Sequence, residues 1–527
     1  MTVEENFVYG HVMDALSGDL YHNKLDVLRE YLQNSYDAIK EYVFSSDNED
    51  IQLKRMNTSK IDIKIDSNSI YIFDNAIGMN LQILNEYRKI GFSRKTKGTY
   101  AGWRGIGKAA GLAVAEMVYV NTSNGEGKGY QLVFKAKELR DAILNAKKTG
   151  INLPLDGLIK NCSDIKEFDE VVGNHYTMVE LHNITGDSKE LLDANKVIAY
   201  LSLIAPLHFN PNFEYANEIE EQLYFYVEDY LPMNLFVNGE QVYKPYLHEW
   251  VGESETAKIK PPKTKEIYDN ENNLIAFCWF CMNSGKGQIT EKMKIANSFV
   301  HVKGLYLRVH NIRIGDEQLT RKYLWYASPE RSFYALGEIH VLDDKVDPTS
   351  GRNDFVDNHA RYQFIHKCAP IVADINYLAQ EHSNKLRSKA VINKKAIEIN
   401  EIATKVENKA IPKNLVSEYI YRTQDVKHEA EKRKKATSEK AVQNKADNII
   451  KKANIVLNKL ETSLREPTVP ENKVYKDILD EIKLTDEAKL VYENIINVLK
   501  NYFVNDPNIL EEILIRIDNA LTDAFSS

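Results

Sequence analysis

The sequence has few cysteines and no long apolar segment. Only four cysteines occur among 527 residues, too few for the disulfide scaffold of a small secreted domain. No run of about 18 or more apolar residues occurs, as a membrane-spanning helix would need, and residues 1–6 lack the basic and then apolar pattern of a secretory signal. These absences predict a soluble cytoplasmic protein that has no membrane partner.

An excess of positive charge is also missing. The formal net charge is -8, which argues against a protein whose entire surface binds nucleic acid. A local basic stretch remains at Lys432-Arg433-Lys434-Lys435, and it can meet phosphates or form a solvated helix face. Hydrophobic residues make up 43% of the chain, so a length of 527 residues predicts several globular domains.

Two of the cysteines have the C-x-x-C spacing of a metal or redox site. Cys278 and Cys281 lie inside the apolar run 274–282, which reads as a buried strand. Residues three apart on a strand point to opposite faces, so the two thiols cannot share a metal. They are therefore expected to be structural.

The chain divides into regions of different periodicity. Residues 1–205 mix helix and strand patterns, with strands expected at 61–65, 70–74, 117–120, 130–134 and 176–181 and a buried helix at 106–115. Residues 206–365 read as a second α/β domain, with strands expected at 223–227, 235–237, 274–282 and 300–309. Residues 366–466 read as helical, and 467–527 as a last helical unit.

Within the helical region, apolar residues follow a 4-3-4-3-4 spacing. They are Val442, Ala446, Ile449, Ala453, Val456 and Leu460. This stripe predicts a helical hairpin or a short coiled coil.

The segment 25–39 carries the first group of chemically interesting residues. Glu30, Asn34 and Asp37 stand at i, i+4 and i+7, within an arc of about 60° on one helix face. Leu28 and Leu32 fall about opposite, so the helix can bind a sheet while its polar face looks elsewhere. Two acids and a carboxamide in this arrangement suit a divalent metal or an activated water, and they also suit a solvated helix face.

Two further segments carry polar and glycine signals. Asp74 ends an expected strand and Gly78 follows it; a carboxylate there can accept a hydrogen bond from an exocyclic amine. Gly102, Gly107 and Lys108 satisfy G-x-x-x-x-G-K, but Ala109 lacks the hydroxyl that a P-loop needs for Mg²⁺. The P-loop interpretation is therefore rejected.

Together these segments resemble the GHKL ATPase superfamily, which includes type II topoisomerases, the ninety-kilodalton heat-shock chaperone, sensor histidine kinases, MutL and the MORC proteins. The box E-x-x-x-N-x-x-D-A is met by Glu30, Asn34, Asp37 and Ala38. Asp74 and Gly78 meet D-x-G-x-G, although Ala76 replaces its first glycine. The lid glycines are met by Gly102, Gly105 and Gly107, and Thr177 matches a later threonine, so four boxes stand in the right order. Residues 91–95 also resemble the family's G-x-S-x-K lid element.

The resemblance implies a Bergerat-type α/β sandwich that binds ATP and Mg²⁺. Asn34 would bind the Mg²⁺ and Glu30 would deprotonate the attacking water. Asp74 would bind the adenine amine. The remaining matches imply an ATP-binding set that also contains Asp37, Ala38, Gly78, Met79, Lys95, Gly102, Gly105, Ile106, Gly107, Lys108 and Thr177.

The second region resembles a transducer domain of the MORC, MutL and chaperone type. Residues 304–313 resemble its strand, and 343–355 resemble the loop that sends a basic residue to the terminal phosphate. Arg352 is the first candidate for this residue and Lys345 the second. Nothing beyond residue 365 carries a resemblance.

The implied function is an ATPase that dimerises through its N-terminal regions on binding ATP and opens after hydrolysis. Its client would be DNA, held in a clamp, or a protein. Bacterial proteins of this build belong to phage-defence or repair systems, which is an analogy of family only. The alternatives are an ATP-gated scaffold that does not hydrolyse and a chaperone. A sensor kinase fits poorly, because no phosphoacceptor helix precedes the ATP domain.

Overall fold

The structure is a computed structural model that describes residues 23–95, 105, 107–149, 155–228, 230–251, 256–284, 292–295, 297–325, 328–465, 485–503, 509–510, 512–517 and 520. The chain divides into two compact units, Met1–Ala379 and Gln380–Ser527. Among the described residues, no helix is both long and apolar enough to cross a membrane.

The first unit contains an eight-stranded sheet of order β5-β4-β3-β6-β2-β1-β7-β8. Its strands are β1 Lys60–Ile65, β2 Ser69–Asp74, β3 Met117–Asn124, β4 Lys128–Phe134, β5 Ser163–Asp169, β6 His175–His182, β7 Asn234–Val237 and β8 Glu240–Val242. All neighbours are antiparallel except β1 and β7. The expected strands of residues 61–181 are confirmed, and the sheet also takes β7 and β8 from the segment after residue 205.

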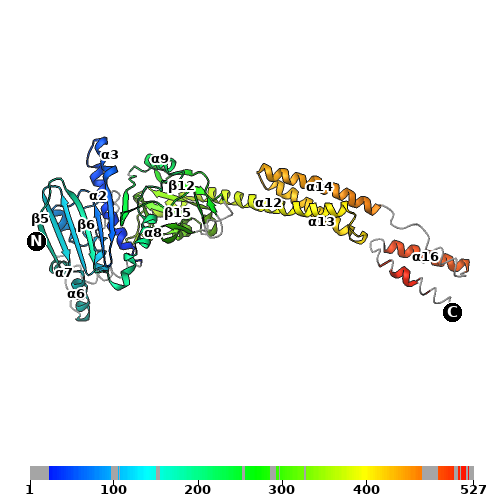
Figure 1. Ribbon diagram of the computed structural model, residues 1–527, viewed down its shortest axis with the longest axis horizontal. Helices are drawn as coiled ribbons and strands as arrows, with labels where there is room; N and C mark the ends of the chain where they lie inside the picture. The colour runs from blue at the N-terminus through cyan, green and yellow to red at the C-terminus, as the bar shows by residue number, and fades with distance from the viewer. Residues whose placement is uncertain are drawn as a thin grey trace. The chain divides into compact units, whose positions relative to one another are not determined.

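Helices cover this sheet and share one core with it (Figure 1). They are α2 Asp26–Phe44, α3 Glu49–Thr58, α4 Leu81–Tyr87, α5 Gly111–Val114, α6 Ala136–Thr149, α7 Leu155–Asn161 and α8 Ala194–Ile204, with 3-10 turns at Gly107–Ala109 and Gly186–Leu192. Leu28, Leu32 and Ile39 of α2 are buried with Ile63 and Ile72 of the sheet. The predicted apolar stripe of the first helix is therefore confirmed.

The same unit holds a second, five-stranded sheet of order β11-β12-β17-β15-β16. Its strands are β11 Lys263–Tyr268, β12 Leu274–Met282, β15 Gly304–Val309, β16 Ile312–Ile314 and β17 Ala335–Val341. Two short hairpins accompany it, with strands β9 Glu249–Val251, β10 Thr256–Lys258, β13 Lys292–Ile295 and β14 Ser298–His301. The nearby helices are α9 Ala216–Tyr226, α10 Glu317–Leu324, the 3-10 turn Pro329–Tyr334 and α11 His359–Lys367.

The cysteines on β12 have the predicted placement. Cys278 belongs to one core cluster of the second sheet and Cys281 to another. All four cysteines are buried and free. The two thiols therefore face opposite sides of the sheet.

Three of the expected elements are wrong or too long. Residues 223–227 belong to the end of helix α9 and the residue after it, because Ile219 and Leu223, four apart, are the residues that the helix buries. The expected strand 300–309 is interrupted before Gly304, whose φ is +75°. Where the structure describes the expected helix 106–115, from residue 107 on, it has a 3-10 turn and the four-residue α5 in place of one helix.

A buried charged cluster joins the two sheets. Glu338 of β17 accepts hydrogen bonds from Lys244, 2.8 Å away, and from Arg308 of β15, 2.6 Å away. All three side chains are fully buried. Arg308 also donates to the carbonyls of Ile204 and Ala205 at the end of α8. The cluster thus connects the second sheet to the end of α8, which packs in the core of the first sheet.

The second unit contains a helical bundle. The described helices that form it are α12 Ala369–Glu407, whose last part lies in this unit, α13 Val416–Lys435 and α14 Lys440–Arg465; a separate helix, α16, covers Asp486–Tyr502. A 3-10 turn at Lys413–Leu415 precedes α13. The whole predicted stripe from Val442 to Leu460 is buried against α12 and α13. The helical character of this region is confirmed, and α13 and α14 form a helical hairpin.

Candidate functional site

A cavity of about 440 Å³ lies in the first unit where α2 meets the end of β2. Its lining combines α2, the segment after β2, the segment around α4, the turn before α5 and the loop after β17. Predicted site residues that line it are Glu30, Asn34, Ala38, Asp74, Gly78, Met79, Lys95, Gly105, Gly107, Lys108, Thr177 and Arg352. Gly102 and Ile106 lie outside the described residues.

Helix α2 supplies one wall of the cavity. Glu30 and Asn34 line it one helical turn apart. Asp37 is fully buried and binds Lys95, with Oδ2 2.7 Å from Nζ. Because Asp37 is fully buried and is not among the described lining residues, it lies behind the wall and binds Lys95 from there.

Asp74 forms the polar end of the cavity at the last residue of β2. Its side chain is 2% exposed, and Ser35 donates a hydrogen bond of 2.6 Å to Oδ2. Burial raises the pKa of Asp74 to about 6, while hydrogen bonds from Ser35, Ala76 and Thr177 and the charge of Lys95 oppose this shift. These contacts hold the carboxylate in place. Because burial disfavours its charged form, a further hydrogen-bond donor from a ligand would stabilise it.

The register between β2 and β6 places Thr177 beside Asp74. Thr177 Oγ1 lies 3.3 Å from Thr122 Oγ1, and Thr122 Oγ1 accepts a 2.9 Å hydrogen bond from the backbone of Met79. The threonines therefore fix the segment after β2 as well as its terminal carboxylate.

The two small residues of this segment have different reasons to be small. Gly78 has a φ of +68°, and a Cβ there would lie 1.8 Å from the carbonyl oxygen of Ser123, so only glycine fits against β3. Ala76 is fully buried in the core, and its carbonyl contacts His175 Nδ1 at 2.6 Å. The methyl group that departs from the family pattern is thus accommodated by the core.

The turn before α5 closes another side of the cavity. A Cβ on Gly107 would lie 2.2 Å from Oε2 of Glu30, so glycine lets this turn approach the acid. Gly105 has a φ of +69°, and its carbonyl accepts a 3.0 Å hydrogen bond from the amide of Gly91. Since α5 has only four residues, the backbone on this side of the cavity comes from the turn that precedes it.

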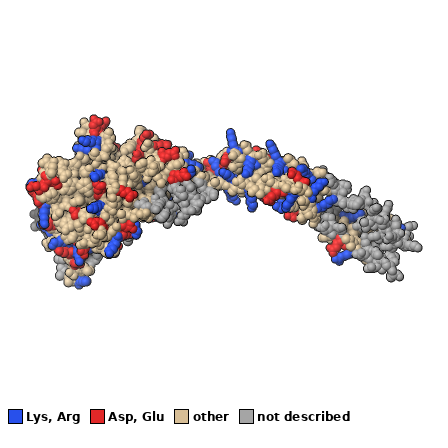
Figure 2. Space-filling model, viewed as in Figure 1, with Lys and Arg blue, Asp and Glu red and all other residues tan. Residues whose placement is uncertain are grey.

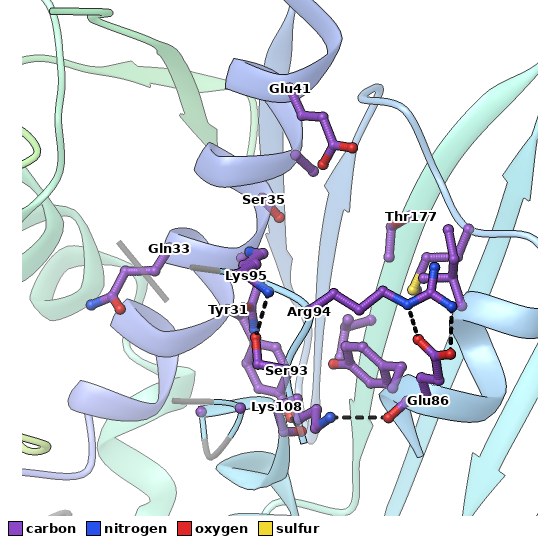
Figure 3. Close-up of a pocket in the computed structure, with 18 of the residues that line it drawn as sticks. Tyr31, Gln33, Ser35, Glu41, Glu86, Ser93, Arg94, Lys95, Lys108 and Thr177 are labelled. Atoms are coloured by element: carbon purple, nitrogen blue, oxygen red, sulfur yellow. Dashed lines mark hydrogen bonds and ion pairs between the residues drawn. The ribbon is translucent and has the colours of Figure 1, made fainter. Parts of the chain in front are cut away.

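Besides Arg352, the cations Arg94, Lys95 and Lys108 line the cavity, and Figure 3 shows the contacts of Arg94 and Lys108 with Glu86. Lys95 binds Asp37, and Lys108 Nζ donates to the carbonyls of Glu86 and Phe92 at 3.2 and 2.7 Å. Arg94 forms a two-point ion pair with Glu86 of α4. Burial lowers the pKa of Lys108 to about 8, so an anion in the cavity would favour its charged form.

The loop after β17 brings Arg352 to the cavity from the second sheet. Arg352 is 6% exposed and lines the cavity together with Ser350. Its backbone adopts a φ of +50°, and its amide donates a 3.0 Å hydrogen bond to the carbonyl of Thr349. Lys345, the second candidate, is exposed and is absent from the described lining.

Several lining residues were not identified from the sequence. Ser35, Tyr31, Glu86 and Arg94 all line the cavity. Tyr31 and Ser35 directly follow Glu30 and Asn34 in the sequence of α2. A prediction that counted a wider face of this helix as part of the site would have included them. Glu86 and Arg94 meet only through the folded chain, and no local pattern predicts their pairing.

The polar wall of α2 has the chemistry to share a magnesium ion. Mg²⁺ prefers oxygen ligands and takes few of them from a protein, the rest coming from water and phosphates. Asn34 lines the cavity with a buried Nδ2 that has no hydrogen-bond partner among the described residues. The amide is therefore not held in place by those residues through Nδ2, its Oδ1 is the atom that would bind Mg²⁺, and Glu30 adds a carboxylate one turn away.

Residues 22–156 match a family model described as histidine kinase-, DNA gyrase B-, and HSP90-like ATPase. This span contains Glu30, Asn34, Asp74 and the turn at Gly107. The comparison with curated proteins gives no match. The family match and the α/β architecture agree, and the N-terminal domain of this chain belongs to the GHKL-type ATPase superfamily.

Proposed function

We propose that the protein binds ATP with Mg²⁺ in this cavity and hydrolyses it. The observation that carries the proposal is that Glu30 and Asn34, one turn apart on α2, line the same cavity as Asp74 and Arg352. One bound ligand would thereby contact four groups: an acid for the adenine, a metal ligand, a base and a cation from a second domain.

The adenine would bind at the Asp74 end. A carboxylate accepts the hydrogen bond of an exocyclic amine, and Ser35 holds Asp74 Oδ2 at 2.6 Å. Apolar side chains of Ala38, Ile77 and Met79 line the same cavity and would contact the ring. Thr177, next to Asp74 in the sheet, would keep the acid in position.

The phosphates would bind between α2 and the turn at Gly107. Asn34 would hold Mg²⁺ together with phosphate oxygens, and the ion would neutralise phosphate charge when bound. Glu30 would orient and deprotonate the attacking water. Lys95 and Lys108 would exchange their present protein partners for phosphate oxygens.

Arg352 would complete the site from the second sheet. A cation that contacts the terminal phosphate stabilises the charge of the transition state. Arg29 Nη2 donates a 3.0 Å hydrogen bond to the carbonyl of Gly351, so the loop that carries Arg352 is attached to the helix that carries Glu30. This link favours Arg352 over Lys345.

In the proposed cycle, ATP favours a closed homodimer of the N-terminal regions, and hydrolysis opens it. The client would be DNA in a clamp or a protein, in phage defence or repair. A scaffold that binds ATP without hydrolysis and a chaperone are the alternatives.

Phosphate release and nucleotide binding should be measured together for the wild type and for Glu30→Gln. The variant is expected to bind ATP and to release phosphate at least about 100-fold more slowly, because a general base contributes this much. Glu49→Gln, on exposed α3, is the matched control. Phosphate release at the background rate by both the wild type and Glu30→Gln, with ATP bound to each, would favour the scaffold.

A further inference from the structure

The helical bundle of the second unit, residues 380–465, has a charge opposite to that of the rest of the chain. Residues 380–465 contain 20 lysines and arginines but only 11 aspartates and glutamates, while the whole chain carries a net charge of -8. The bundle is therefore strongly basic and the remainder of the chain strongly acidic. Figure 2 shows lysine and arginine side chains projecting along this unit.

The basic run at the end of α13 does not account for this surface. Lys432 and Arg433 lie 3.5 and 3.3 Å from the carboxylate of Glu429. Lys434 lies 2.7 Å from Asp447. Two carboxylates, Glu429 and Asp447, thus offset about half of the charge of the four cations that stand out in the sequence.

Helix α14 presents more lysines than acids. From residue 440 to 460 its only carboxylate is Asp447, which Lys434 neutralises. Lys445 and Lys452 are seven residues apart, so they lie on the same side of the helix about 10 Å from each other. Exposed Lys440 and Lys451 add charge to the solvent side of α14.

Neutral partners on α12 fix these two lysines. Lys445 Nζ donates to Asn393 Oδ1 and Lys452 Nζ to Asn400 Oδ1, both at 2.7 Å. An amide positions an ammonium group without cancelling its charge. The equal spacing of the two contacts also shows that α12 and α14 run parallel here.

Lys389, exposed and one turn before Asn393, extends the same side of α12. The α12–α14 lysine face consists of Lys389, Asn393, Asn400, Lys445 and Lys452. One heptad further, Lys459 corresponds in register to Glu407 of α12, so the uncompensated charge is greatest around Lys445 and Lys452.

We propose that the α12–α14 lysine face binds the phosphate backbone of a nucleic acid without reading its sequence. Repeated cations on a rigid surface suit a polymer of evenly spaced phosphates, and lysine and asparagine side chains both donate to phosphate oxygens. The apolar stripe of α14 is buried in the bundle core, so it offers no apolar face to a lipid surface. The inference deepens the proposed function by naming its client, but it rests on charges outside the ATP cavity.

The test measures binding of the full chain to a labelled DNA duplex of arbitrary sequence, by fluorescence anisotropy over a range of salt concentrations. In Lys445→Gln/Lys452→Gln each glutamine still offers an amide donor near Asn393 and Asn400. The expected result is an affinity at least about tenfold lower at moderate salt and a salt dependence reduced by about two phosphate contacts. Thermal unfolding followed by circular dichroism checks that the bundle is intact.

The matched control is Lys409→Gln/Lys413→Gln, which removes two exposed lysines from the connection between α12 and α13. Equal losses in both double variants would overturn the site. So would wild-type affinity in Lys445→Gln/Lys452→Gln, or binding to polyglutamate or phosphatidylserine vesicles but not to the duplex.

Phosphate release without DNA, measured on the same proteins, separates the two proposals. Duplex binding that depends on Lys445 and Lys452 in a protein that releases no phosphate would support the inference and contradict the proposed hydrolysis. Normal phosphate release with no duplex binding would contradict the inference alone.

Discussion

Arg29 donates a hydrogen bond from Nη2 to the carbonyl oxygen of Gly351, 3.0 Å away. Arg29 also pairs with Asp26 at 3.2 Å and with Glu30 at 3.4 Å. One buried guanidinium therefore contacts the proposed base, the beginning of α2 and the loop that carries Arg352. A displacement of the second sheet would therefore act on Glu30 through the contacts of Arg29.

Arg352→Ala is expected to slow hydrolysis strongly while leaving ATP binding within a few fold of the wild type. A cation at the terminal phosphate acts mainly in the transition state and contributes roughly 10³-fold or more to the rate. Single-turnover phosphate release at saturating ATP measures this. Lys345→Ala removes an exposed lysine of the same loop and should leave the rate unchanged; the reverse pattern would reassign the role to Lys345.

Nucleotide affinity is expected to fall as the pH falls through about 6, the pKa to which burial raises Asp74. The ionised carboxylate accepts the adenine hydrogen bond, and protonation removes much of this acceptor capacity. Titration calorimetry with a non-hydrolysable ATP analogue from pH 7.5 to 5 measures the effect. An affinity that stays constant over this range would contradict the assignment of Asp74.

The stability of the nucleotide-free protein should change with pH in the opposite sense. The pKa of Asp74 is about 6 in the fold against an ordinary 3.8. Its contribution is therefore fully present below 3.8 and is lost as the pH rises through about 6. Asp74→Asn should stabilise the nucleotide-free protein at pH 7.5 by on the order of 2–3 kcal/mol while weakening ATP binding. A destabilised variant would contradict this account.

Glu86→Gln is expected to strengthen ATP binding by a few fold. The Arg94 side chain is 49% exposed and Glu86 21%, and their ion pair holds Arg94 on the protein instead of on a phosphate. Removing the carboxylate frees the guanidinium for an anion. The binding constant of an ATP analogue, with Glu49→Gln as the control, measures the change, and weaker binding would show that the pair instead supports the occupied site.

Glu338→Gln is expected to destabilise the first unit by about 3–5 kcal/mol, because it leaves buried cations without their counter-charge. Burial would raise the pKa of Glu338, but Arg308 and Lys244 hold it well below its usual range. Urea unfolding measures the loss. Glu266→Gln on the exposed strand β11 is the control, and similar midpoints for both variants would contradict the proposed role of the cluster.

Local patterns predicted much of the first domain. The apolar stripe of α2 and the alternation of isoleucines in β1 depend on one element facing one core. Such elements can be recognised without knowing the fold. The strip that carries Glu30 and Asn34 was placed on the cavity side for the same reason.

The missed features depend on contacts distant in sequence. The parallel pairing of β1 with β7 joins residues 60–63 to 234–237, and the hydrogen bond between Ser35 and Asp74 spans 39 positions. The segment Leu223 to Val227 is apolar enough for a strand. It instead ends a helix whose buried residues are Ile219 and Leu223. The lysine face could not be predicted either, because such a prediction requires knowing which acids lie beside each lysine in the folded bundle.

The most direct test of the central claim is single-turnover hydrolysis by Glu30→Gln at measured ATP occupancy in the presence of Mg²⁺. The account predicts a protein that is filled with ATP yet releases phosphate at least about 100-fold more slowly than the wild type. Phosphate release at the wild-type rate from a filled site would contradict the role of Glu30.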